Sequence, residues 1–110
     1  MPRYLHQFGY STDSIKGMIT TPQNRREAAE KIFSAAGGKV LDMYFCFGEF
    51  DGIAISEFPA QVNATAVALT VGSSGAFSKM HTTVLIEMDE AVEAMQKAGG
   101  LVGSYTPPAE

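Results

Sequence analysis

Two neighbouring apolar segments, residues 39–48 (KVLDMYFCFG) and 51–59 (DGIAISEFP), most constrain what this chain can fold into. Each alternates with the two-residue period of a β-strand and the gap between them is short, so they predict a hairpin. The alternation assigns Val40, Asp42, Tyr44 and Cys46 to one face of the first strand, and Leu41, Met43, Phe45 and Phe47 to the other. A sheet with one face in water should instead alternate apolar with polar residues. We therefore expect both faces of this sheet to be covered.

The other elements follow from periodicity and from residues that begin and end helices. Alternating residues 3–10 predict the first strand, and Ser11 or Thr12 caps a short helical turn that Gly17 is expected to end. Pro22 suits the first turn of a helix that continues to residue 38, with Arg25 among its outward residues. Further along, the sequence predicts an Ala-rich helix at 60–75, a strand at 76–87 and a final helix at 87–100.

The resulting order, β-α-β-β-α-β followed by an extra C-terminal helix, is typical of the ferredoxin-like α+β fold. Its sheet has four antiparallel strands, and the helices lie on one face. With 110 residues the chain has room for one core, so we predict one domain over residues 1–104 and a loosely ordered tail over residues 105–110.

The second face of the sheet then needs a cover that this fold does not supply. Hydrophobic residues make up 45% of the chain and charged residues 18%, which is more apolar surface than one small core hides. The simplest cover is a second copy of the same sheet, packed face to face across a two-fold axis as a dimeric α+β barrel. A contact of roughly 1,500 Å² or more would account for the excess. The expected partner is the chain itself, as a homodimer.

Charge and hydropathy exclude other partners. The net charge of −4 and the pI of about 5.1 give no electrostatic reason to bind a phosphate backbone, so no nucleic-acid partner is expected. No apolar run reaches the roughly 18 residues of a membrane span, and the N-terminus lacks the pattern of a signal peptide. A single cysteine, Cys46, agrees with a reducing compartment. We expect a cytoplasmic protein without a membrane partner.

The turn of the hairpin, Gly48-Glu49-Phe50-Asp51, brings two carboxylates close together. Two neighbouring acids can separate their pKa values and act as acid and base. A Gly-x-x-Asp-Gly turn has its own use for these residue types, because Gly48, Asp51 and Gly52 tolerate positive φ and Asp accepts backbone N–H bonds. We interpret the motif mainly as a structural turn. A hairpin end can also overhang a pocket, which leaves a functional role open.

Polar residues on otherwise apolar strands are the better candidates for a ligand site. The predicted ligand-binding residues are Tyr10, Lys16, Tyr44 and His81, in a cleft between sheet and helices that would take a small apolar or aromatic ligand. The candidate catalytic residues are His81, His6 and Tyr10, which could transfer protons on a phenol-like substrate. The alternative is that Tyr10 and Tyr44 are interface aromatics with hydrated hydroxyls.

Metal and cofactor sites find little support. His6 and His81 lie on the first and fourth strands, which are neighbours in the expected sheet, and with Glu57 they could form a facial triad. Their spacing carries no recognisable ligand motif, and none of the predicted helices contains a histidine that could be a haem ligand. We therefore predict no metal and no cofactor.

Three stretches together resemble the bacterial GYD-domain family, a branch of the dimeric α+β barrel superfamily: residues 4–18, residues 25–55 and residues 87–100. The most specific parts are Tyr10-Ser11-Thr12 followed by Ile15-Lys16-Gly17, and the turn at 48–51. The family pattern has Tyr where this chain has Phe50. The resemblance implies a ferredoxin-like fold and dimerisation through the sheets.

The wider superfamily includes cofactor-independent monooxygenases, haem enzymes and small-ligand sensing domains, so kinship alone selects no chemistry. The leading hypothesis is a small-molecule-binding homodimer. The alternatives are a cofactor-independent monooxygenase or isomerase acting on an aromatic or polyketide-like substrate, and a structural or interaction module.

Overall fold

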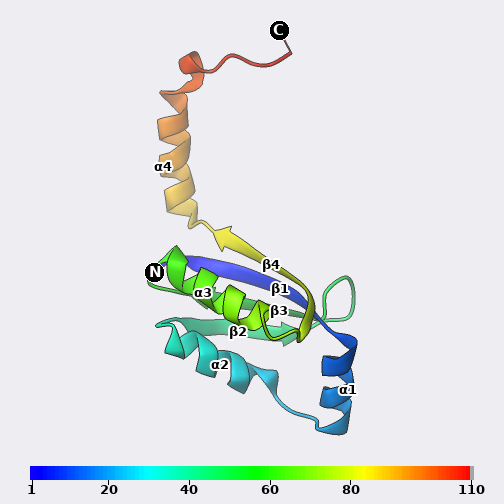
Figure 1. The fold of residues 1–110 in the computed structure, drawn as a ribbon. Coiled ribbons are helices and arrows are strands. Elements are labelled where there is room, and N and C mark those ends of the chain that lie inside the picture. The colour runs from blue at the N-terminus through cyan, green and yellow to red at the C-terminus, as the bar shows by residue number, and fades with distance from the viewer. Residues whose placement is uncertain (110) are drawn as a thin grey trace.

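The structure is a computed structural model that describes residues 1–109, and its elements follow the predicted order with one additional helix (Figure 1). They are β1 (Arg3–Tyr10), α1 (Thr12–Thr20), α2 (Arg25–Ala35), β2 (Lys39–Phe45), β3 (Gly52–Glu57), α3 (Gln61–Gly72), β4 (Phe77–Leu85), α4 (Met88–Gly99) and a 3-10 turn (Val102–Ser104). All four predicted strands are present.

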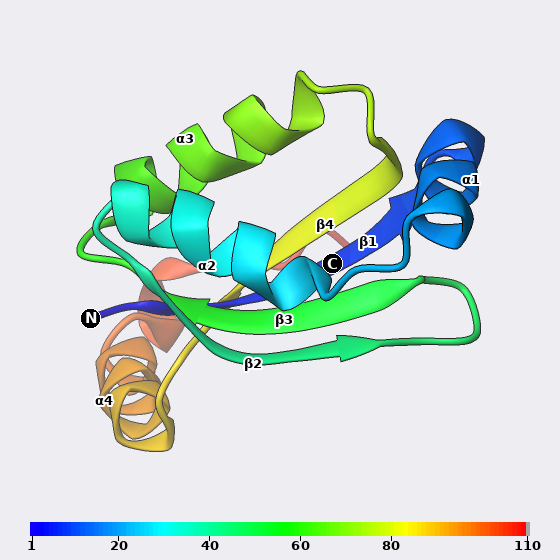
Figure 2. The same ribbon diagram turned by 90° about the horizontal axis from the view of Figure 1, so that it is seen from below.

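The four strands form one antiparallel sheet in the order β2-β3-β1-β4, so the first and last strands of the chain are neighbours as expected. Helices α2 and α3 lie side by side on the same face of this sheet (Figure 2). This arrangement confirms the predicted α+β, ferredoxin-like fold. The first strand occupies an inner position, which places the residues at its end, including Tyr10, under the covering layer.

The segment between β1 and β2 differs from the prediction. The expected short turn is a nine-residue helix, α1, that continues past Gly17; its cap is Ser11, whose side chain accepts a hydrogen bond from the Ser14 N–H at 3.2 Å. A single exposed glycine costs a helix only about 1 kcal/mol, which the cap offsets. The second helix begins at Arg25 rather than at Pro22, because Asn24 caps it by accepting from the Arg26 N–H at 2.9 Å.

The core lies on the helix-covered face of the sheet, in two clusters, of which the larger is covered by α2 and α3 and the smaller is contacted by Met18 of α1. The larger one surrounds the fully buried ring of Phe58 and contains Tyr4, Phe33, Val40, Ala64 and Val67. The smaller one lies at the other end of the sheet and contains Phe8, Tyr10 and Ala54. Glycine is required twice by close approach: a Cβ on Gly38 would collide with the Phe58 ring, and one on Gly52 with the Phe8 ring.

A β-bulge in β2 corrects the predicted face assignment of that strand. The register shifts between Val40 and Asp42, so Val40 is opposite the buried Ser56 on the helix-covered face, whereas Asp42 and Tyr44 are opposite Ile55 and Ile53. The inserted residue reverses the alternation. Val40 and Tyr44 therefore lie on opposite faces, although simple alternation places them together.

The face of the sheet opposite α2 and α3 has no covering helix among the described residues (Figure 2). We call it the open face. Cross-strand partners share a face, and the pairs Leu5–Ile55, Gln7–Ile53, Gln7–His81 and Tyr44–Ile53 define it. Its apolar centre is Leu5, Ile53 and Ile55, which are only half-buried, and Tyr44 is 62% exposed. We expected both faces of the sheet to be covered, but within the described part of a single chain no layer packs on the open face.

Helix α4 projects away from the rest of the molecule (Figure 1). None of its residues is buried, and Met88, Val92 and Met95 form an exposed apolar stripe at helical spacing. The radius of gyration is 17.9 Å, whereas about 13 Å is expected for a compact chain of this length. An isolated helix of this length is only marginally stable in water. The described residues do not give α4 the packing contacts that would stabilise it.

No helix formed by residues 1–109 has the length and hydropathy that crossing a bilayer requires. Residues 105–109, which follow the 3-10 turn, form no helix or strand, and Glu110, the last residue of the predicted loose tail, lies outside the described residues. The domain limits given from the sequence stay a prediction.

Candidate functional site

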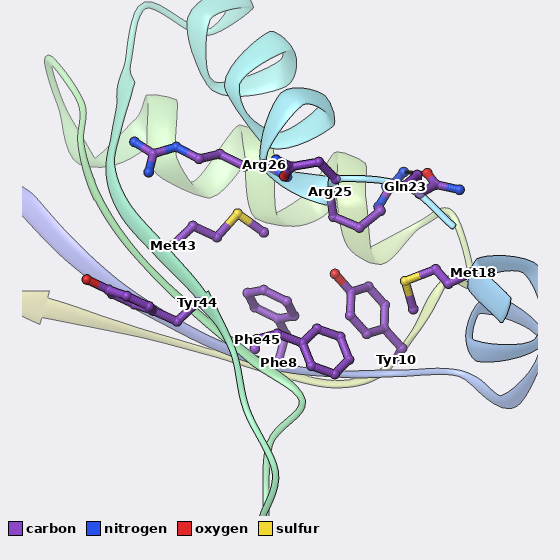
Figure 3. Close-up of a pocket in the computed structure, with 11 residues that line it drawn as sticks. Phe8, Tyr10, Met18, Gln23, Arg25, Arg26, Met43, Tyr44 and Phe45 are labelled. Atoms are coloured by element: carbon purple, nitrogen blue, oxygen red, sulfur yellow. Dashed lines mark hydrogen bonds between the residues drawn. The ribbon is translucent and has the colours of Figure 1, made fainter. Parts of the chain in front are cut away.

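A cavity of about 210 Å³ lies between the sheet and the beginning of α2, at the end where β1 meets α1 (Figure 3). Its walls come from both layers. The lining residues are Phe8, Tyr10, Met18, Gln23, Asn24, Arg25, Arg26, Met43, Tyr44, Phe45 and Gly52. Most of the walls are apolar, and a few polar groups converge at one end, which is the usual construction of a small-molecule site.

Tyr10 contributes both an aromatic ring and a hydroxyl group to the lining of this cavity. It is the last residue of β1, and its ring stacks between Phe77 and Phe45, with centroid distances of 5.1 and 6.3 Å. The side chain is buried, and the hydroxyl points into the cavity towards Arg25 and Gln23 (Figure 3). Stacking on both sides fixes the direction of the ring, so the hydroxyl is presented in one orientation.

Arg25 and Gln23 form the polar end of the cavity. The Arg25 guanidinium donates to the Gln23 side-chain oxygen at 2.7 Å, and Gln23 is itself held by donating to the Thr21 carbonyl at 3.1 Å. Within residues 1–109 no salt bridge joins Arg25 to a carboxylate, whereas the next residue, Arg26, pairs with Glu30 at 3.3 Å. Arg25 thus supplies a positive charge at the cavity that no carboxylate of the described residues pairs with.

Burial raises the pKa of the Tyr10 hydroxyl above its ordinary value. The positive charge of Arg25 and its contact with the hydroxyl oppose this rise, and the Asp51 carboxylate adds to it. The phenol is consequently protonated at neutral pH, and it acts as a hydrogen-bond donor rather than as a base.

Asp51 has a more specific position than a turn-forming residue needs. Its side chain accepts a hydrogen bond from the Tyr10 N–H at 2.8 Å, and its own N–H donates to the Phe8 carbonyl at 2.9 Å. Asp51 therefore ties the turn to the end of β1, next to the residue that presents its hydroxyl to the cavity. The expectation of positive φ in this turn was wrong: among the described residues only Gly37 and Gly75 have it. Gly52 is required by the Phe8 ring instead.

We expect Asp51→Ala to lower the free energy of unfolding by about 1.5–3 kcal/mol, because a hydrogen bond to a charged acceptor is lost and the Tyr10 N–H is left without a partner. Glu49→Ala is the matched control, since Glu49 is exposed in the same turn, and its effect should stay within about 0.5 kcal/mol. Urea denaturation of the two variants measures the difference. Equal losses of unfolding free energy in the two variants would contradict the specific stabilising role of Asp51.

His6 lies on the helix-covered face, away from the cavity. Its Nε2 hydrogen-bonds the hydroxyl of the fully buried Ser56 at 2.7 Å, and its ring contacts Phe33 edge-on with a centroid distance of 5.3 Å. Burial lowers the pKa of His6 from 6.5 to about 4. The imidazole is therefore neutral at pH 7 and belongs to the core.

His81 lies on the other side of the sheet. It is opposite Gln7 on the open face, while His6 is opposite Thr82, so the two histidines lie on neighbouring strands but point to opposite faces. The His81 ring contacts Phe50 at a centroid distance of 5.2 Å, and Lys79 lies 4.8 Å from the centre of that Phe50 ring. The structure does not bring His81, His6 and Tyr10 together at one site.

The remaining predicted ligand residues are spread over the surface. Lys16 is exposed on α1, and Tyr44 borders the cavity only at its edge, with its ring pointing away (Figure 3). Of the four residues predicted to bind ligand, Tyr10 alone has its polar group inside. Within residues 1–109 no cluster of three His, Cys, Asp or Glu side chains is arranged to hold a metal ion.

Sequence reasoning missed the residues that contribute most to the polar end. Arg25 was assigned to the outer face of its helix, but it is half-buried at the first position of α2, where the chain has just turned in from the loop. Helical periodicity does not fix which way such a first residue points. The sequence feature that could have identified Arg25 as a site residue is the pair of adjacent arginines directly after the Asn24 cap.

Comparison with known proteins gives a family and a fold. No curated protein matches the chain. A solved structure described as the crystal structure of FFRP-DM1 is similar, with a TM-score of 0.54 and 17% sequence identity over 78% of this chain and 100% of that one. At this identity the likeness shows the fold alone. The GYD domain model matches residues 4–95, which include all of the sheet except Arg3 and every residue that lines the cavity. The chain belongs to the GYD domain family.

Proposed function

We propose that this protein is a homodimer that binds a small molecule in the cavity beside Tyr10. The observation that carries the ligand part is the convergence of the Tyr10 hydroxyl, Arg25 and Gln23 at one end of an otherwise apolar cavity. Arg25 donates to Gln23 and has no carboxylate partner among residues 1–109, so part of its guanidinium is available to a ligand.

Two uncovered surfaces support the dimer part. The open face leaves Leu5, Ile53 and Ile55 without a covering layer, and α4 leaves its stripe of Met88, Val92 and Met95 exposed. Figure 2 places α4 on the side of the sheet opposite α2 and α3, which is the side of the open face. A second copy packed sheet to sheet would cover the open face and bring each α4 next to the partner's sheet.

The rival function, a cofactor-independent monooxygenase or isomerase, would use His81, His6 and Tyr10 as proton-transfer groups. Such catalysis needs the groups within hydrogen-bonding reach of one substrate. The two histidines lie on opposite faces of the sheet, and the pKa of Tyr10 is raised. No observation therefore favours this function over ligand binding.

A thermal-shift screen with small molecules tests the ligand part. A ligand at one hundred times its Kd stabilises the native state by about 2.7 kcal/mol, which should raise Tm by roughly 10 °C. We expect Met18→Trp, which fills the cavity from α1, to remove the shift, and Val62→Trp, which changes a residue of α3 that is 72% exposed and lies outside the cavity, to retain it. A hit that shifts both variants equally binds elsewhere and would contradict the proposal.

A further inference from the structure

The size of the cavity limits what it can hold. Ligand pockets commonly measure about 300–1,000 Å³, and this one is smaller, at about 210 Å³. A single ring with a short substituent matches a space of this size.

The walls favour a flat aromatic ring. Phe8, Tyr10 and Phe45 supply aromatic faces and edges, and two methionines, Met18 and Met43, supply adaptable thioether contacts. Aromatic pairs gain from offset and edge-on geometry beyond the area they bury, and sulfur–aromatic contacts add to this. An aromatic ring therefore gains more in this cavity than an aliphatic group of the same volume.

The polar end presents hydrogen-bond donors and positive charge. Arg25 has donors to spare after its bond to Gln23, and Gln23 uses its amide N–H on Thr21. The Tyr10 phenol, which is protonated at neutral pH, is a donor as well. The Asp51 carboxylate, which also acts on the Tyr10 hydroxyl, already accepts a hydrogen bond from the Tyr10 N–H. Such a constellation matches an acceptor that carries a negative charge.

We propose that the ligand is a small aromatic carboxylate, with its carboxylate between Arg25 and the Tyr10 hydroxyl and its ring against Phe8, Phe45 and the two methionines. This inference rests on the proposed ligand-binding function and narrows it to one chemical class. Arg25 provides the charge and the forked donors that a carboxylate accepts in a bidentate manner, and Tyr10 provides a third donor.

Benzoate and its neutral analogue benzamide are suitable probes, because the two have nearly the same shape and differ in charge. We expect isothermal titration of the full chain to give a benzoate Kd about 10- to 100-fold below that of benzamide. Arg25→Gln should abolish that preference by weakening benzoate alone. Tyr10→Phe should weaken benzoate about three- to tenfold while leaving the stacked ring in place.

Lys31→Gln is the matched control, because it removes one exposed positive charge from the same helix and should leave the ratio unchanged. The outcomes separate the two proposals. Equal binding of benzoate and benzamide, or a ratio that survives Arg25→Gln, would overturn the carboxylate inference and preserve the ligand site. If neither probe binds while neutral compounds from the screen do, the same inference fails. If no compound of any class binds at the cavity, both proposals fail.

Discussion

Tyr44→Asp is expected to convert the proposed homodimer into a monomer. Tyr44 is 62% exposed on the open face, opposite Ile53, so in a sheet-to-sheet dimer it would lie in or beside the interface. The substitution would bury a carboxylate without a partner, and the two-fold axis would repeat this cost in both copies. We expect the dimer Kd to rise about 100-fold or more.

Sedimentation velocity at micromolar concentration measures this effect. The wild type should sediment with twice the 11.8 kDa mass of the chain, and the variant with the mass of one chain. Val62→Asp makes the same kind of change at a residue of α3 that is 72% exposed on the other side of the molecule, and it should remain a dimer. Because both side chains are largely exposed in one chain, neither change should unfold it.

A wild-type chain that is monomeric at these concentrations would contradict the dimer directly. If the wild type is a dimer and Tyr44→Asp does not dissociate it, the interface lies elsewhere. Met95→Asp then distinguishes the remaining possibility, because Met95 lies on the exposed stripe of α4. Dissociation by Met95→Asp alone would place the contact on α4 rather than on the open face.

The fold could be predicted from the sequence because local signals agreed with one another. Strand periodicity in residues 3–10 and 51–59 and the order of the elements were enough to give the sheet order. The failures were local. Alternation cannot detect a bulge, so the position of Val40 was wrong. Gly17 and Pro22 predict helix boundaries less well here than the capping residues Ser11 and Asn24 do. The predicted first helix is therefore too short, and the predicted second helix begins too early.

The candidate site was less predictable because a pocket depends on where side chains point. Tyr10 was found because a polar residue at the end of an apolar strand is unusual. Arg25 was not found, since it belongs to a region where the chain changes direction. His6 and His81 are on neighbouring strands as predicted, yet their sheet faces depend on a register that one sequence does not reveal.

The free energy of unfolding is expected to decrease by about 2.5 kcal/mol through His6 alone when the pH falls from 7 to 4.5. The folded-state pKa of His6 is about 4, below the ordinary value of 6.5 that applies to the unfolded chain. Between these values the unfolded chain binds a proton that the folded chain does not, so stability falls as the pH falls through this window. Each pH unit of difference corresponds to about 1.4 kcal/mol.

Urea denaturation at pH 7, 5.5 and 4.5 and at fixed protein concentration measures this loss, and His6→Gln isolates it from the titration of the carboxylates. Glutamine keeps a polar group near the Ser56 hydroxyl but carries no titrating ring, so the variant should be less stable at pH 7 and less sensitive to acid. His81→Gln, on the exposed open face, should retain the sensitivity of the wild type. If His6→Gln and the wild type lose equal stability between pH 7 and 4.5, His6 is protonated in the folded chain, and its bond to Ser56 does not require the neutral ring.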